Sequence, residues 1–309
     1  MSARTLASLL LAFLMATFAP TGAQAAEDLG AAFKGMIDAH GDGVEAGIWV
    51  GGVEGEPSLS IRPDAVMPTA STIKTAYLIE LFAAYPDALD APLPGADAIL
   101  NETGHPALAP YTDDQRAGIR KSLRGASTRR IGETMMGGFE APNDVYNAAA
   151  SLVTAALGGP VALTAKIAAR DPAFAPIQAR RYMLAPRDQP GDNTATTRAL
   201  AAVIQRLAAG TLKGVSGPTH EAIRRAMETR KVNGRTLISK TGSLDTDPIT
   251  RCRTGWIESP NGPVVYAIML QQPGPGARPR PEAAQRLHDL VGAIERLVIG
   301  DAGGPRSLR

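Results

Sequence analysis

Residues 66–82 read VMPTASTIKTAYLIELF and place a hydroxyl and an amine three positions apart, at Ser71 and Lys74. Pro68 and Thr69 mark the entry of a helix, and the apolar residues after them predict that this helix is largely buried. Residues three apart share a helix face, so the Lys74 amine can reach the Ser71 oxygen. In the first turn, free backbone N–H groups and the helix dipole favour a developing negative charge.

This pattern admits two interpretations. If burial lowers the pKa of Lys74, its neutral amine can accept the Ser71 proton and make the serine a nucleophile. Alternatively, Ser71 caps the helix and Lys74 is solvated, because Ser-x-x-Lys is short enough to occur by chance. A second, independent motif is needed to favour the first interpretation.

That second motif lies far downstream, in residues 234–244, which read GRTLISKTGSL. Their alternation predicts a strand with Thr236, Ile238 and Lys240 on one face. Gly242 would let a substrate backbone approach the N–H groups of its neighbours. Ser-x-x-Lys followed by Lys-Thr-Gly resembles the motif set of class A β-lactamases and penicillin-binding proteins.

The resemblance implies an α/β (α+β) fold of the β-lactamase and transpeptidase type, forming one domain overall. We expect an antiparallel five-stranded sheet flanked by terminal helices, plus an all-helical lobe, with the cleft between them. The expected division is an α/β lobe over 26–65 and 210–300, a helical lobe over 66–209 and a tail over 301–309. The expected elements are helices at 28–40, 219–229 and 281–299, strands at 44–53, 57–62, 235–243, 251–258 and 263–271, and a helix-rich middle from 71 to 209.

The resemblance also implies roles for single residues. Ser71 would form an acyl-enzyme with Lys74 as its base, and the backbone N–H groups of Ser71 and Ser243 would form the oxyanion hole. Lys240, Thr241 and Arg251 would bind the substrate carboxylate, close to Gly242. Asn147 would bind the substrate amide.

The middle motif of the family is altered in this chain. Residues 147–160 read NAAASLVTAALGGP, which looks like the helix that carries this motif and ends in Gly-Gly-Pro. Matching backwards from its end puts Asn147 on the motif asparagine and leaves Val145 in place of the motif serine. Tyr146 is one position away and is a candidate replacement, although adjacent helical residues point about 100° apart. A tyrosine of the core or of the cleft wall is the alternative.

A larger departure lies in residues 181–197, RYMLAPRDQPGDNTATT, which look like the omega loop of the family. Counting back from its Pro-Gly-Asp puts Tyr182 at the position of the glutamate that activates the deacylating water. Asp188 or Asp192 is a candidate substitute base, but an aspartate in a loop rich in Pro and Gly also fits a turn or capping role.

Arg251 lies in the strand after the Lys-Thr-Gly strand, where some class A enzymes keep an arginine for the substrate carboxylate. A guanidinium can hold a carboxylate with two hydrogen bonds. Arg253 lies on the same face by strand alternation, so either arginine fits this role. A solvated arginine on an edge strand is the alternative for both.

The N-terminus predicts export. Arg4, the apolar run 6–18 and the small residues 23–25 predict a signal peptide over 1–25, and so a secreted or periplasmic protein that does not stay in the membrane after cleavage. The single cysteine, Cys252, excludes an internal disulfide, and its strand position favours a packed thiol.

The composition and motifs of the chain limit the kinds of binding partner that we expect. A net charge of +2 over 309 residues gives no electrostatic reason to expect nucleic acid or an anionic membrane. No zinc-type cluster, phosphate loop or dinucleotide fingerprint is present, so we expect no metal and no cofactor. The expected partner is a small molecule, either a β-lactam or a compound resembling a cell-wall peptide, and the expected state is a monomer.

We therefore expect a secreted serine hydrolase of the class A β-lactamase type, acting on β-lactams or a related amide or ester. The alternative is a penicillin-binding protein or binding module that is acylated without efficient deacylation. The lack of any Glu between Glu140 and Glu221 favours the alternative. The intact set of Ser71, Lys74 and Lys240 favours the enzyme.

Overall fold

The computed structural model describes residues 22–41, 43–187, 191–274 and 280–301. The helices are α2 (Gly22–His40), α3 (Lys74–Ala84), α4 (Ala96–Asn101), α5 (Asp113–Leu123), α6 (Thr128–Met136), α7 (Asn143–Ala156), α8 (Gly159–Arg170), α9 (Thr197–Ala209), α10 (Gly217–Ala226) and α11 (Pro281–Asp301). The short 3₁₀ turns are η1 (Ala70–Ile73), η2 (Pro86–Ala88), η3 (Gly138–Glu140) and η4 (Pro172–Phe174). The strands are β1 (Glu45–Gly51), β2 (Leu59–Ile61), β3 (Met67–Pro68), β4 (Thr194–Ala195), β5 (Glu228–Val232), β6 (Arg235–Leu244), β7 (Ile249–Ile257) and β8 (Val264–Gln272).

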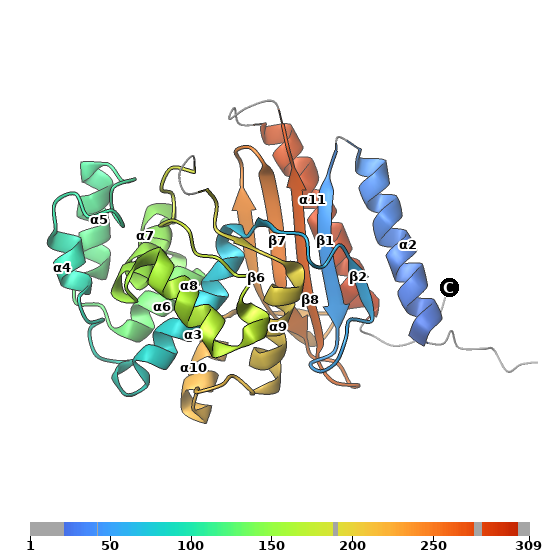
Figure 1. The fold of residues 1–309 in the computed structure, drawn as a ribbon, viewed down its shortest axis with the longest axis horizontal. Helices are drawn as coiled ribbons and strands as arrows, with labels where there is room; N and C mark the ends of the chain where they lie inside the picture. Colours follow the sequence, from blue (N-terminus) through green and yellow to red (C-terminus); the bar gives the residue numbers. More distant parts are fainter. Residues whose placement is uncertain (1–21, 42, 188–190, 275–279, 302–309) are drawn as a thin grey trace, which may run out of the picture.

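The main sheet is antiparallel, with strand order β2-β1-β8-β7-β6-β5. Helices α2 and α11 cover one of its faces, and the remaining helices lie on the other side (Figure 1). The mixed α and β architecture predicted from the sequence is confirmed. Helix α9, which falls inside the range expected for the helical lobe, packs on β7 and β8 of the sheet.

The sheet has six strands where five were expected. The extra strand is β5, which occupies part of the segment predicted to continue the helix at 219–229. Asn233 and Gly234 both adopt positive φ, 50° and 77°, as a two-residue turn between antiparallel strands requires. The turn pairs β5 with β6, so α10 ends at Ala226 and the chain becomes an edge strand.

Two hydrophobic cores follow from strand alternation. In β7, Trp256 is buried among the helices of the lobe, whereas the next residue, Ile257, is buried against the terminal helices. Leu237 and Ile238 of β6 divide in the same way. Successive strand residues point to opposite faces, so a sheet covered on both sides needs apolar residues at consecutive positions.

Two predictions about single elements are confirmed. Helix α11 begins at Pro281 and buries its apolar stripe in the core between the sheet and the terminal helices. Cys252 is buried and free, and burial raises the pKa of its thiol to about 12, which suits a packed group better than a reactive one. The predicted signal peptide lies mostly on residues 1–21, and the tail mostly on residues 302–309, both outside the described residues.

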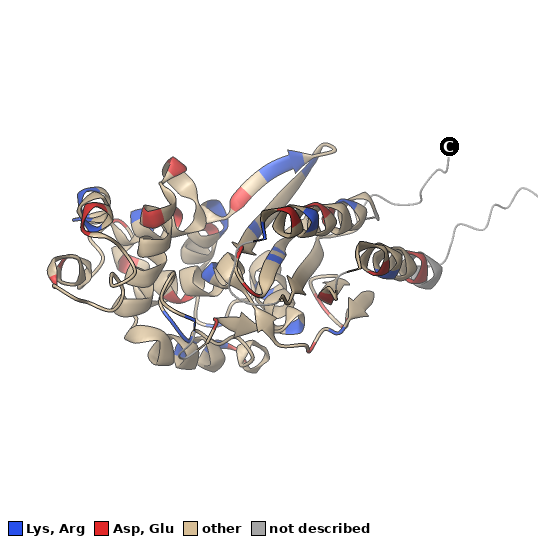
Figure 2. Ribbon diagram, turned by 90° about the horizontal axis from the view of Figure 1, so that it is seen from above, with Lys and Arg blue, Asp and Glu red and all other residues tan. Residues whose placement is uncertain are grey.

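Charged residues of both signs lie on the surface helices, and β5 carries one acidic and two basic residues (Figure 2). Among the described residues, no single helix is long and apolar enough to cross a membrane; α7 and α8 reach the required length only together, with a bend of 76° between them.

Candidate active site

Ser71 lies in the turn that leads into α3. The sequence predicted that Ser71 opens the helix, but η1 comes first and α3 begins at Lys74. Side chains three apart are eclipsed in a 3₁₀ helix, so Ser71 and Lys74 still share a face. Ala70 adopts φ 46°, a left-handed conformation that is unfavourable for a residue with a Cβ. The turn therefore presents Ser71 from a strained backbone.

Lys74 is fully buried beneath this turn. Burial, and then the charge of Lys240, lower the pKa of its amine well below the ordinary value for lysine. The amine donates to Asn147 Oδ1 at 3.0 Å and lies 3.1 Å from the centroid of the Tyr146 ring. No carboxylate among the described residues pairs with it. A buried lysine without a counter-ion is suited to the neutral form that a base requires.

Tyr146 lies between the two lysines of the site. In addition to its contact with Lys74, the Tyr146 ring has its centroid 5.4 Å from Lys240 Nζ. Lys240 is buried within β6 and donates to the carbonyl oxygen of Thr241 at 3.1 Å. The structure thus brings the middle motif and both lysines together, with the tyrosine ring as the common contact.

Asn147 is held by its neighbour one turn earlier on α7. Its Nδ2 donates to Asn143 O at 2.9 Å and to Asn143 Oδ1 at 3.0 Å, while its Oδ1 accepts from Lys74. The amide is thereby oriented toward the lysine. Asn143 was not singled out from the sequence, although its position four residues before Asn147 on one helix face is a signal that identifies it.

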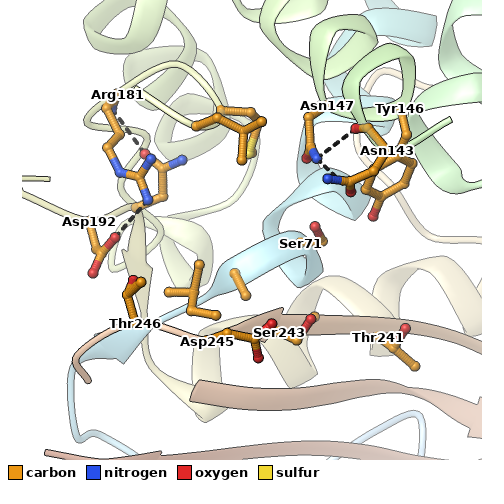
Figure 3. Close-up of a pocket in the computed structure, with 16 residues that line it drawn as sticks. Ser71, Asn143, Tyr146, Asn147, Arg181, Asp192, Thr241, Ser243, Asp245 and Thr246 are labelled. Atoms are coloured by element: carbon orange, nitrogen blue, oxygen red, sulfur yellow. Dashed lines mark hydrogen bonds and ion pairs between the residues drawn. The ribbon is translucent and has the colours of Figure 1, made fainter. Parts of the chain in front are cut away.

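Strand β6 forms the opposite wall and approaches the turn very closely. A Cβ added to Gly242 would lie 2.7 Å from Ser71 N, so only glycine fits. Thr241 and Ser243 flank this contact and line a cavity of about 380 Å³ that also contains Ser71. Figure 3 shows Ser71 between these strand residues and the side chains of α7. The arrangement places the N–H of Ser71 beside β6, as an oxyanion hole needs.

The third wall comes from the loop after α8. The residue expected at the position of the deacylating glutamate was Tyr182, but the next residue, Met183, faces the cavity in its place. Met183 and Leu184 line the cavity, but Tyr182 does not. The Tyr182 ring instead packs edge-on against His105, with the centroids 6.2 Å apart and the hydroxyl directed toward Gly159. Burial raises the pKa of Tyr182, which weakens it further as a base. Asp188 lies outside the described residues.

Asp192 faces the cavity but is engaged in ion pairs. It accepts from Arg181 Nη2 at 2.8 Å and from Arg187 Nε at 2.9 Å. Asn193, the next residue, accepts from the backbone of Arg181 through its side chain and from the backbone of Thr69 through its carbonyl oxygen. Asn193 therefore anchors the loop to the residue that precedes the Ser71 turn, and Asp192 holds two parts of the loop together.

Arg251 does not reach the cavity. Its guanidinium donates to Leu244 O at 3.0 Å and to Asp245 Oδ1 at 2.7 Å. Arg253, the other candidate, pairs with the buried Glu295 of α11 at 2.8 Å. Neither arginine is among the residues that line the cavity, whereas Thr241 lines it and Lys240 precedes Thr241 on β6 and lines the neighbouring cavity. The described residues contain no group of three His, Cys, Asp or Glu side chains able to hold a metal ion.

Several solved structures share the fold of this chain. No protein-family model and no curated protein matches the chain. An engineered variant of the class A β-lactamase of the last common ancestor of Gram-negative bacteria superposes with a TM-score of 0.65 at 20% identity, over 88% of this chain and 97% of that one. The β-lactamase of Sphaerobacter thermophilus gives 0.63 at 22% identity, over 90% and 97%.

A third structure is a mutant of the penicillin-binding protein PBP-A, described as an acyl-enzyme complex with penicillin G. It matches with a TM-score of 0.62 at 20% identity, over 89% of this chain and 96% of that one. The chain therefore has the fold shared by class A β-lactamases and this penicillin-binding protein. At these sequence identities the comparisons establish the fold only, and the activity has to be inferred from the residues of the site.

Proposed function

We propose that the chain is a serine hydrolase of the class A β-lactamase type that forms an acyl-enzyme through Ser71. Its substrates are β-lactams or a related amide or ester. The observation that carries this proposal is the buried Lys74 amine, which has a lowered pKa and shares one face of a tight turn with Ser71. The close approach of Gly242 to the serine N–H supports the oxyanion hole.

In the proposed reaction, neutral Lys74 accepts the proton of the Ser71 hydroxyl while Ser71 Oγ attacks the substrate carbonyl carbon. The N–H groups of Ser71 and Ser243 stabilise the charge on the carbonyl oxygen. The bond from the carbonyl carbon to the leaving nitrogen then breaks, and the nitrogen takes up the proton that Lys74 received. Asn147, which accepts a hydrogen bond from Lys74, and Tyr146, whose ring lies against it, orient the amine.

Deacylation is the weaker half of the proposed cycle. Met183 and Leu184 are apolar, Tyr182 faces away, and Asp192 is held by two arginines. We therefore favour slow turnover, and a protein that is acylated and stays acylated is the alternative supported by the same residues. Export, cleavage after Ala25 and a monomeric state belong to this proposal and rest on the sequence alone.

Intact-mass spectrometry over time, after mixing the protein with penicillin G, tests the proposal. We expect the mass of one penicillin molecule to be added and then lost slowly. An adduct that persists indicates a penicillin-binding role. The proposal fails if no adduct forms and no penicillin is consumed.

A further inference from the structure

A second cavity, of about 540 Å³, adjoins the one that contains Ser71. Tyr146 and Thr241 line both cavities, so the two spaces meet at the tyrosine that contacts Lys74. The walls of the second cavity come from α6, η3, the end of α10 and the start of β5. A substrate group that extends from Ser71 past Tyr146 would enter this second cavity.

Part of this cavity is apolar. Met136 and Met227 are buried at its wall, and the Phe139 side chain is 51% exposed beside them. Phe139 and Glu140 both adopt positive φ, 63° and 49°, which residues with a Cβ rarely do. The guanidinium of Arg130 lies 3.6 Å from the Phe139 ring centroid and supports it. A strained turn that keeps an aromatic ring exposed at a cavity suits contact with a hydrocarbon chain.

Two carboxylates, those of Glu133 and Glu228, line this cavity. The charges of Arg129 and Arg130 act on Glu133, but neither Glu133 nor Glu228 forms a hydrogen bond or a close ion pair with another described residue at the cavity. Arg225 also lines it but pairs with Glu221 at 2.9 Å. Burial raises the pKa of Glu133, which a bound cation would offset. Lys240 is the remaining cation of this cavity and adjoins the first cavity through Thr241.

The course of the reaction determines which part of a substrate would enter. The leaving nitrogen must take up the proton that Lys74 carries, and the Lys74 amine lies on the Tyr146 ring. The leaving group therefore departs beside Tyr146, where the second cavity opens. The acyl group stays bonded to Ser71 on the side of Met183 and Leu184.

We propose that the second cavity is a leaving-group subsite for an amino acid with a long basic side chain. Its carboxylate would bind Lys240, its methylene chain would contact Met136, Met227 and Phe139, and its terminal amine would bind Glu133. The inference rests on the proposed acylation of Ser71 and adds the class of leaving group. No β-lactam is needed for it, because the bond that breaks is an ordinary amide and the products are the acyl-enzyme and a free amino acid.

The test compares three N-acetylalanyl amides, whose leaving groups are lysine, norleucine and 2-aminoadipate, each made with both configurations at both residues. These leaving groups have similar length and differ in terminal charge. For the preferred isomer we expect kcat/KM for amino acid release to be about three- to tenfold higher with lysine than with norleucine, and lowest with 2-aminoadipate. Equal rates, or no release by a protein that penicillin G still labels at Ser71, would overturn the proposal. Failure of penicillin labelling would count against the proposed function instead.

Glu133→Gln provides the matched variant. It should bring the ratio of lysine to norleucine rates close to one, while Glu140→Gln, which changes an exposed carboxylate outside the cavity wall, should keep the wild-type ratio. Phe139→Ala should lower kcat/KM for lysine and norleucine by a similar factor, because the ring contacts the chain and not its charge. Thermal unfolding of each variant confirms that it is folded. A wild-type ratio in Glu133→Gln would contradict the assignment.

Discussion

Two walls of the same cleft differ in how their polar groups are used. The wall built from η1, α7 and β6 holds a serine, a buried amine without a counter-ion and a glycine that lets two backbones touch. In the wall built from residues 181–187 and 191–193, Asp192 lies between two arginines, and Met183 and Leu184 are the uncharged surface. The first wall holds a serine beside an amine that has no counter-ion among the described residues, whereas the carboxylate of the second wall is already paired.

This difference between the walls bears on the two steps of an acyl-transfer reaction, formation of the ester and its hydrolysis. Forming the ester requires a nucleophile, a base and stabilisation of the oxyanion, and the proposed function assigns all three to the first wall. Breaking the ester requires a base that activates water, and both oxygens of the Asp192 carboxylate already accept hydrogen bonds from guanidinium groups. The comparison predicts fast acylation and slow hydrolysis.

The largest effect on acylation is expected from Ser71→Ala, which removes the proposed nucleophile of the first wall. Without the hydroxyl no ester can form, so labelling by penicillin or by a fluorophosphonate probe should be lost completely while the thermal midpoint changes little. Ser122→Ala, which removes an exposed hydroxyl on α5, is the matched control and should be labelled like the wild type. Labelling that survives in Ser71→Ala would assign the nucleophile to another residue.

Lys74→Arg tests the base of the same wall. Arginine stays protonated in a protein, so the acylation rate should fall by about 10²- to 10⁴-fold. In the wild type, acylation should be fast above the lowered pKa of Lys74 and fall as the pH decreases through it, because protonation removes the base. Stopped-flow acylation across pH measures both effects, with Lys166→Arg on the surface of α8 as the control. A pH-independent rate would rule out the neutral lysine.

A carboxylate added to the second wall should reduce the difference between the walls. Met183→Glu places one at the cavity and should speed the loss of the penicillin adduct by about tenfold, below the full range for a general base because the loop is not shaped to hold a water. Tyr182→Glu should not accelerate the loss, since its side chain would face His105 and Gly159. Adduct decay followed by mass spectrometry compares the two. Rescue by Tyr182→Glu alone would show that position 182 faces the substrate.

The smallest effect should come from Tyr146→Phe. The ring face contacts Lys74, and phenylalanine keeps that face, so we expect acylation to fall by less than about tenfold. Tyr146→Ala removes the ring and should cost more. The acylation rates of both variants, measured with the same penicillin, distinguish orientation by the ring from proton transfer by the hydroxyl. A loss in Tyr146→Phe as large as in Lys74→Arg would assign the proton transfer to the hydroxyl.

Local sequence patterns predicted much of the fold. The period-two alternation of β6, the apolar stripe of α11 and the spacing of Ser71 and Lys74 each depend on residues close together in the chain. Strand β5 was missed because a helical pattern continued into it, and only pairing with β6 makes it a strand. Local propensity is a weak guide where a partner strand decides the outcome.

The sequence by itself determined the fold class, the two lysines, the serine and the lack of a glutamate in the loop, because residue identity and short-range spacing suffice for these. Only the tertiary structure decided that Met183 faces the cavity in place of Tyr182, that Arg251 is held by Asp245, and that Tyr146 lies on Lys74. In an irregular loop no periodicity tells which side chain points inward. The partner of a charged group is likewise set by segments far apart in the chain, whose approach depends on the packing of the whole fold.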